Sequence, residues 1–210
     1  MATYDLEEQE QLDALKAWWK QNSHVVLVAV AAALLLVAAW NGWRWYQRTQ
    51  AEQAATLYET LQNAARMNDS KAVRDAAGTI LEKYSGTGYA PLAALVSAKA
   101  SYQAGDLKTA RAQLEWVVDN ARQEGVSAIA RLRLAAVLMD DHAYDEAMKL
   151  VSVKPAEAFD ALYASMRGDI LSAQNKRDEA RAAFKTALTK ASDVTFREVL
   201  RLKLEALGER

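Results

Sequence analysis

The run "VVLVAVAAALLLVAAW", residues 25–40, constrains the fold of this chain more than any other feature. No Asp, Glu, Lys or Arg occurs across residues 21–43. A helix over that range is roughly 33 Å long, so it can cross a hydrocarbon core of about 30 Å. The pattern predicts a transmembrane helix over residues 21–46, with a tail at 1–20 and a larger domain at 47–210.

Tryptophans flank this segment on both sides. Five of the six tryptophans in the chain stand there, namely Trp18, Trp19, Trp40, Trp43 and Trp45. Roughly 32 Å of helix rise would separate Trp19 from Trp40, and amphipathic indole rings favour the headgroup level of a bilayer. We therefore predict that these residues form two membrane-interface belts in contact with lipid.

Two other interpretations of the apolar segment stay open. One is a buried helix of a soluble bundle, since the alanines make the segment only moderately hydrophobic. The other is a cleavable signal peptide, because Val37, Ala38 and Ala39 place small residues where a signal peptidase requires them. The acidic leading region and a helical pattern that continues into Gln53 favour a permanent anchor.

The flanking charges leave the orientation of the span open. Lys16 and Lys20 precede it and Arg44 and Arg48 follow it, which is a tie under the positive-inside rule. The tail in front holds five acidic residues against two basic ones, with leucines at helical spacing. Such a tail fits a short amphipathic helix whose acidic face is solvated or contacts a basic protein surface.

The composition favours helices throughout the chain. Eight Gly and two Pro are few for 210 residues, and β-branched residues are sparse, so strands and tight hairpins have little support. The absence of Cys excludes disulfides, thiolate zinc sites and a lipidated cysteine. With a net charge of −1 and no basic stripe, the sequence predicts no nucleic-acid binding.

The domain after the span contains a repeated pattern. The segments "AGDLKTARAQLEWV", "DHAYDEAMKLVSV" and "QNKRDEARAAFKTAL" each place a small residue after a polar turn and a bulky apolar residue four positions later. The small residues are Ala110, Ala147 and Ala180, and Ala72 lies in a weaker copy. Their spacings of 38, 37 and 33 residues are close to the roughly 34-residue helix-turn-helix unit of tetratricopeptide repeats.

Small side chains recur because two antiparallel helices approach closely only where one offers a small residue to the other. We expect Gly168 to play that role on the first helix of the last unit. Stacked helix pairs form a solenoid, so the predicted fold is all-α: a single N-terminal transmembrane helix followed by a tetratricopeptide-like α-solenoid of antiparallel helix pairs. A final capping helix is expected to bury one apolar stripe. That stripe comprises Phe196, Val199, Leu200, Leu204 and Leu207.

Three local features set the expected element boundaries. The first solenoid helix is expected from Arg48 to about Met67, continuing the membrane helix or hinging just outside it. Asn41-Gly42 is the expected flexible point, since Gly costs about 1 kcal/mol within a helix. The next break is "YSGTGYAP", whose Pro91 suits the first turn of a helix.

Chemistry-bearing residues are few. His24 stands at the expected membrane edge, and His142 lies among acidic residues in "MDDHAYDE". One His with carboxylates around a turn is a weak metal-ligand pattern, and acids there suit the N-terminus of the following helix. The sequence has no phosphate-binding glycine loop and no nucleophile motif, so we predict a protein that is not an enzyme and has no cofactor or metal.

Solenoids of this kind bind partners on the concave surface formed by the first helix of each pair. Counting back from the small residues gives the inward positions as Leu95, Lys99 and Tyr102, then Leu132, Ala136 and Met139, then Ser165, Asp169 and Ser172. A groove that is apolar at one end and polar at the other suits an extended or unfolded peptide. The alternative is that its apolar side chains are covered by the chain's own helices.

Three segments carry a resemblance to a known family: "LKAWWKQN" before the span, "GWRWYQ" after it and "GDILSAQNKRDEARAAFKTAL" in the last repeat. Along its whole length the chain resembles the YfgM family, the ancillary subunits of the bacterial SecYEG translocon. The resemblance implies an inner-membrane protein with a cytoplasmic N-terminus and a periplasmic repeat domain. It also implies partnership with the translocon and with a membrane-anchored periplasmic chaperone of the prolyl-isomerase type. No catalytic motif comes with the family.

These features give two hypotheses of function from different classes. The first is an anchored scaffold and chaperone helper that assists newly exported, still unfolded proteins at the translocon. The second, also suggested by the family, is a regulatory adaptor in an envelope stress response that acts through the cytoplasmic tail. An exported soluble hydrolase would need cleavage after Ala39 and a catalytic cluster that the sequence does not offer.

Overall fold

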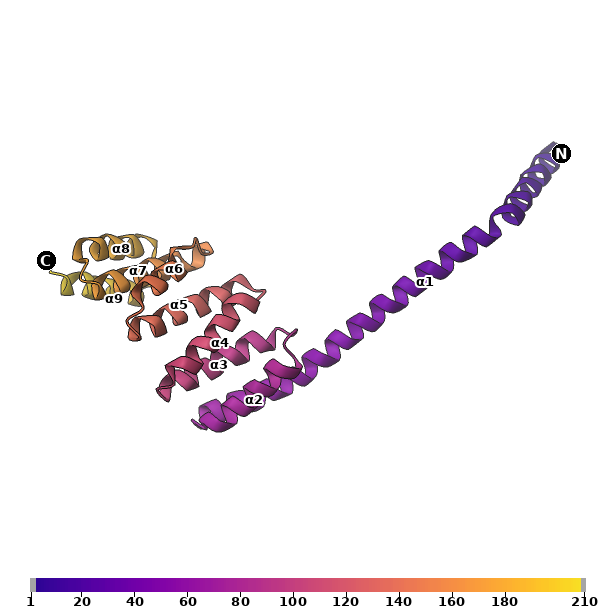
Figure 1. Cartoon of the computed structure of the whole chain (residues 1–210). Coiled ribbons are helices and arrows are strands. Elements are labelled where there is room, and N and C mark those ends of the chain that lie inside the picture. The colour runs from indigo at the N-terminus through magenta and orange to yellow at the C-terminus, as the bar shows by residue number, and fades with distance from the viewer. Residues whose placement is uncertain (1–2, 209–210) are drawn as a thin grey trace. The chain divides into compact units, whose positions relative to one another are not determined.

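The computed structural model describes residues 3–208, with side chains from Glu10 onward. It contains nine α-helices in that range and one short 3-10 turn, η1 (Glu157–Phe159), and no strand (Figure 1). The helices are α1 (Thr3–Arg66), α2 (Ser70–Lys83), α3 (Tyr89–Gln103), α4 (Leu107–Asn120), α5 (Glu124–Asp140), α6 (Tyr144–Ser152), α7 (Asp160–Ala173), α8 (Arg177–Lys190) and α9 (Val194–Ala206). The all-α prediction is confirmed.

The chain divides into two compact units, residues 1–49 and 50–210. In the first unit α1 is long and apolar enough to cross a membrane, and none of its most apolar window is buried within the chain. Leu34, Leu35 and Leu36 are each at least 65% exposed. A core helix of a soluble bundle would instead be covered by its neighbours. An apolar surface without a protein cover is the surface that lipid solvates.

The expected hinge at Asn41-Gly42 does not interrupt the helix. Both residues lie inside α1, which also takes in the tail helix and runs on into the first solenoid helix, one of the two arrangements expected there. A single glycine costs about 1 kcal/mol in a helix, which the many alanines and leucines on either side of it offset. The helix thus continues unbroken into the solenoid, and flexibility at Asn41-Gly42 stays a prediction.

The second unit is a run of antiparallel helix pairs (Figure 1). The pairs α3–α4, α5–α6 and α7–α8 pack within themselves and against the next pair, and α9 covers α8. The first helices of neighbouring pairs also touch, α3 with α5 and α5 with α7. These contacts produce the solenoid that the repeat spacing predicts, with one face formed by the first helices.

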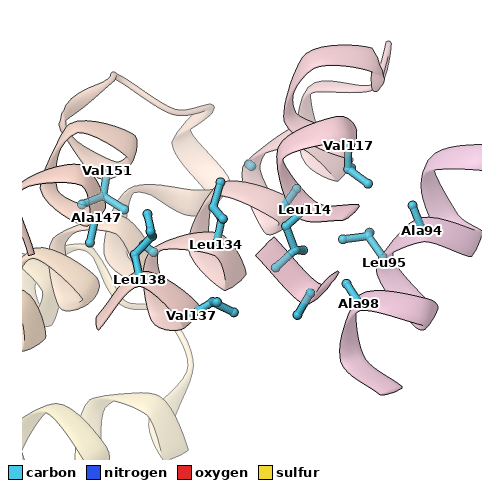
Figure 2. Packing of buried hydrophobic residues seen from close by; sticks show 14 of the residues in the cluster. Ala94, Leu95, Ala98, Leu114, Val117, Leu134, Val137, Leu138, Ala147 and Val151 are labelled. Carbon is cyan, nitrogen blue, oxygen red and sulfur yellow. The ribbon is translucent and has the colours of Figure 1, made fainter. Parts of the chain in front are cut away.

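The small side chains lie at buried helix contacts, as predicted. Ala110, Ala147 and Ala180 are fully buried. The bulky residues four positions later are also buried; these are Leu114, Val151 and Phe184. In Figure 2, Leu114 of α4 lies between Leu95 of α3 and Leu134 of α5, so one bulky side chain joins two successive repeats. Burying such a leucine contributes about 1.5–3 kcal/mol, which explains why the repeats hold together only when stacked.

In each helix pair, the turn between the two helices holds a residue with a positive φ, which is left-handed backbone geometry. This residue stands five positions before the small residue of the helix contact. Asn68, Gly105, His142 and Asn175 have φ values of 56°, 78°, 57° and 60°. Counting five positions on from Asn68 gives Val73, which is 1% exposed, whereas Ala72 is only partly buried. The assignment of Ala72 to the contact position in the weakest copy is therefore wrong by one residue. Several alanines stand close together there, so sequence spacing alone cannot fix the register.

Two predicted contacts at the C-terminal end have different outcomes. A Cβ at Gly168 would lie 2.5 Å from Cε1 of Phe184, so only glycine lets α7 approach α8 this closely, as predicted. In the capping helix α9, Leu200 and Leu204 are buried and Phe196 and Leu207 partly so, but Val199 is 41% exposed. The placement of Val199 in the buried stripe is wrong because it stands one position away from Leu200, on the outer flank of the helix.

Aspartates begin several of these helices. Asp69, Asp106 and Asp193 are the N-cap residues of α2, α4 and α9, and their carboxylates accept backbone N–H bonds from the first turn. The acids near His142 behave differently. The N-cap of α6 is Ala143, and Asp145 follows within the first turn, where a negative charge complements the helix dipole.

Candidate functional site

Three adjoining hollows run along the face formed by the first helices of the solenoid, and together they are called the groove here. The first, of about 110 Å³, lies beside the turn before α2 and the C-terminal half of α3. The second, of about 390 Å³, shares Lys99 and Gln103 with the first. The third, of about 490 Å³, shares Tyr102 and Ala136 with the second and extends to α7. The shared residues place the three hollows next to one another across successive repeats.

The second hollow combines an apolar floor with a cationic wall. The floor is formed by Ala98, Leu114, Ala136 and Val137, and the polar lining by Lys99, Tyr102, Gln103 and Arg133. Arg133 Nη1 donates one long hydrogen bond of 3.5 Å to the carbonyl oxygen of Leu95, and Lys99 has no hydrogen bond or ion pair with any described residue. Two cations from different helices thus face the same space without a carboxylate between them.

The third hollow has the opposite charge. The hydroxyl of Tyr102 donates a 2.6 Å hydrogen bond to Oδ2 of Asp140, which joins α3 to the end of α5. This hydrogen bond, together with repulsion between the carboxylate and a phenolate, raises the pKa of Tyr102 above its ordinary value. Met139 and Met166 supply flexible apolar surface beside the pair.

Asp169 also lines the third hollow, but its charge is matched by a cation from the capping helix. Nζ of Lys203 lies 2.7 Å from both carboxylate oxygens of Asp169 and 3.3 Å from Oγ of Ser165. The same ammonium stands 5.4 Å from the centre of the Phe184 ring. This arrangement fastens α9 to α7 and leaves Asp140 as the carboxylate without a cationic partner on this part of the groove.

The structure brings most of the sequence-predicted groove residues together. Lys99, Tyr102, Ala136, Met139, Asp169 and Ser172 line the second or third hollow. Leu95 is only 7% exposed and belongs to the core, and Leu132 packs against the same core. Ser165 is 5% exposed beneath Lys203. The positions nearer the N-termini of these helices are thus covered by the chain's own helices, and those nearer the C-termini remain open.

Sequence reasoning missed several residues that line the groove, among them the larger side chains of Gln103, Arg133, Asp140 and Met166. Arg133, Ala136 and Asp140 stand at spacings of three and four on one face of α5. The predicted stripe of α5 began one residue earlier, at Leu132, because the inward positions were counted back from the small residues. A search for charged residues on the face next to the leucine stripe would have found both Arg133 and Asp140.

The tryptophans of α1 and His142 lie outside the groove. Trp18, Trp19, Trp40, Trp43 and Trp45 are each at least 49% exposed. Nδ1 of His142 lies 2.8 Å from the hydroxyl of Tyr144, within the turn before α6. Among the described residues no group of three or more His, Asp or Glu side chains is placed to hold a metal ion.

Comparisons with known proteins agree with this architecture over nearly the whole chain. Residues 16–209 match the family model described as a tetratricopeptide repeat-like domain. A protein of Haemophilus influenzae named "Ancillary SecYEG translocon subunit" is 31% identical, and the match covers 97% of this chain and 99% of that protein. Proteins with the same name from Neisseria gonorrhoeae and Escherichia coli are 31% and 28% identical, covering 96% of this chain in each case.

A solved structure shares the fold of the solenoid. It is titled "MamA RS-1 ArsTM double mutant", with a TM-score of 0.53 and 16% identity over 75% of this chain and 96% of that one. The likeness supports the fold alone, since the identity is low. The family match and the full-length relatives, with an apolar helix ahead of stacked helix pairs, show that this chain belongs to the YfgM family of ancillary SecYEG translocon subunits.

Proposed function

We propose that this protein is a membrane-anchored scaffold of the SecYEG translocon, and that its solenoid holds chaperones and newly exported chains near the exit site. The observation that carries the proposal is that relatives named for this role align with both the apolar helix and the solenoid. The proposed partners are the translocon, a periplasmic chaperone of the prolyl-isomerase type, and unfolded exported proteins.

The anchor sets the proposed location. Residues 21–46 span the bacterial inner membrane once, residues 1–20 lie in the cytoplasm, and residues 47–210 lie in the periplasm. The length of the apolar helix and its uncovered surface support a membrane position. Tryptophans at both ends fit the two headgroup layers, where their exposed rings find both apolar and polar neighbours.

The groove supports a binding role for the solenoid. Its floor is apolar, its walls carry separate cationic and anionic groups, and it extends across three repeats. Extended peptides contact such surfaces through alternate side chains. A solenoid tethered beside the exit site needs only weak contacts, because tethering raises the effective concentration of each partner.

Gentle solubilisation of membranes followed by affinity purification tests the proposal. We expect the full-length protein to recover translocon subunits. The comparison variant has residues 1–46 replaced by a cleavable export signal, so that the same solenoid reaches the periplasm without its anchor, and it is expected to lose most of that recovery. Deleting residues 1–20 alone should leave the recovery intact, and loss in this variant would point to the tail as the docking element.

Topology is tested separately on intact spheroplasts. Carbonate washing should leave the protein in the membrane pellet, and external protease should degrade the solenoid while sparing only a short N-terminal fragment. A soluble solenoid after washing, or protection of the whole chain from protease, would overturn the proposed location.

A further inference from the structure

The cations of the second hollow lack the carboxylate partners that several other basic groups have at helix contacts. Arg111 bonds Glu115 and Glu146, Lys190 bonds Asp160, and Lys203 bonds Asp169. Lys99 has no such partner, and Arg133 has only a long bond to a carbonyl oxygen. Two unmatched cations that face one hollow raise the local potential and attract an anionic group.

The residues around these cations favour a ligand that carries apolar groups as well as a negative charge. The floor beneath them is apolar, since edges of the largely buried Ala98, Leu114 and Val137 reach the hollow, so a ligand that combines a carboxylate with apolar side chains suits it. A fully hydrated ion would leave that floor uncovered. The favoured ligand is therefore a polypeptide segment in which an acidic residue stands beside apolar ones.

The position of the cations along the groove indicates an internal segment of a chain. The first hollow adjoins the second at Lys99 and Gln103, and the third adjoins it at Tyr102 and Ala136. A bound chain can therefore enter at one end and leave at the other, with its carboxylate side chain in the middle. A chain terminus held at the cations would leave one of the flanking hollows empty.

The third hollow makes one end of the groove different from the other for a bound chain. Asp140 carries a negative charge there, and its bond from Tyr102 fixes the position of that carboxylate. A second acidic residue in the ligand would be repelled at this end, whereas an apolar side chain would meet Met139 and Met166. The groove thus distinguishes the two ends of an extended acidic-apolar sequence.

Building on the proposed function, we propose that the groove selects extended internal segments with one acidic residue flanked by apolar residues, and that it holds the acidic side chain between Lys99 and Arg133. The occupant is a polypeptide in an extended form, as it is before folding. Backbone groups stay accessible in such a segment, and alternate side chains point to the groove.

Fluorescence anisotropy with the full-length protein in detergent micelles tests this selection. The probes are dodecamer peptides of Ala, Ser and Leu, blocked at both ends, that differ only in one central residue: Glu, Gln or Lys. We expect the Glu peptide to bind roughly threefold to tenfold more tightly than the Gln peptide, and the Lys peptide to bind most weakly. The difference should shrink in 1 M salt, where the Debye length is about 3 Å.

A charge reversal separates selection from folding. The variant Lys99→Glu with Arg133→Glu should reverse the order so that the Lys peptide binds most tightly, which a merely unfolded protein cannot do. The matched control Lys71→Glu with Lys154→Glu changes the net charge equally at exposed positions outside the groove, and should keep the original order. Circular dichroism verifies that each variant keeps its helices.

Each outcome bears on one part of the proposal. Equal binding of the three peptides would overturn the charge selection while leaving the peptide groove intact. No binding of any peptide would overturn both, and translocon association would still be judged by copurification. Tightest binding of a Gln peptide with an unblocked C-terminus would identify a chain end as the ligand and overturn the internal segment.

Discussion

The contact between Gly168 and Phe184 offers a quantitative test of the repeat packing. Replacing Gly168 with alanine adds one Cβ to the centre of α7. That atom would lie 2.5, 2.6 and 2.9 Å from Cε1, Cδ1 and Cζ of Phe184. Carbon atoms pack best at about 3.5–4.0 Å, so the overlap is on the order of 1 Å along one edge of the ring. The ring is 2% exposed and has little room to move.

Two effects of opposite sign decide the magnitude. Alanine stabilises a helix interior by about 1 kcal/mol relative to glycine. Overpacking of a buried contact costs about 1–3 kcal/mol. The net change expected for Gly168→Ala therefore runs from about zero to 2 kcal/mol of destabilisation.

Gly78 supplies the matched control that isolates the packing effect. It lies inside α2, is exposed, and a Cβ there would have no neighbour within 4 Å. Gly78→Ala should therefore show only the propensity gain, a stabilisation of about 1 kcal/mol. The difference between the two alanine variants removes the propensity effect. It should equal the overpacking cost of about 1–3 kcal/mol.

The assay is urea unfolding of the full-length protein in detergent micelles, followed by circular dichroism, with hydrogen exchange to locate the change. Repeats are stabilised by their nearest neighbours, so faster exchange is expected in α7, α8 and α9, and little change in α2 and α3. Adding Phe184→Leu to Gly168→Ala should recover part of the loss, because the smaller side chain makes room for the new methyl group. Two alanine variants that stabilise the protein equally would refute the close approach of α7 to α8.

Three further predictions follow from turns, caps and ion pairs. His142 has a φ of 57°, so His142→Gly should leave the free energy of unfolding within about 1 kcal/mol of the parent, whereas His142→Val should lower it by about 1–2 kcal/mol in urea titrations. Hydrogen bonds from the side chain and then the backbone N–H of Thr109 lower the pKa of Asp106 in the folded protein. The carboxylate therefore stabilises the fold above the ordinary carboxyl pKa, and this stabilisation is lost as the pH falls through the lowered folded pKa. Asp106→Asn should remove this pH dependence from acid unfolding curves. Lys203→Met should reduce stability by about 1 kcal/mol and speed hydrogen exchange in α9, and an unchanged α9 would show that Asp169 does not hold it.

The sequence predicted those features that depend on strong, regular physical signals. The length of a charge-free apolar helix can be compared directly with the thickness of a bilayer, so residues 21–43 could be recognised as a candidate span without a structure. Close helix contacts require small side chains, so Ala110, Ala147, Ala180 and Gly168 could be identified from spacing alone. Their burial in the structure confirms that reasoning.

The errors arose where several residues satisfy the same rule. In α2, alanines stand at neighbouring positions, and only the left-handed turn at Asn68 shows that Val73 takes the contact. In α9, Val199 and Leu200 are both apolar, and the packing of α8 decides which one is buried. Register depends on contacts between elements, and spacing within one element does not carry that information.

The same limit applies to the groove. Leu95 was counted among the inward positions, with burial by the chain's own helices as the alternative, and it is buried between successive repeats. The open surface belongs to the charged neighbours of the leucine stripe. In a solenoid both faces of a first helix are useful, one for stacking and one for binding. Apolar residues go to the stacking face, because burial there removes them from water.

Weak binding by the groove is consistent with the proposed role, because the anchor raises the effective concentration of an emerging chain at the solenoid. Two exposed ion pairs and a small apolar floor give modest affinity, since each exposed pair contributes only about 0.2–1 kcal/mol. A solenoid held beside an emerging chain experiences an effective concentration on the order of 1 mM, so a dissociation constant of about 100 µM already gives about 90% occupancy. Release then remains fast, which lets a chain move on to fold. A groove with much higher affinity would retain exported chains, so the exposed, incompletely paired cations suit a transient holder better than a deeply buried site would.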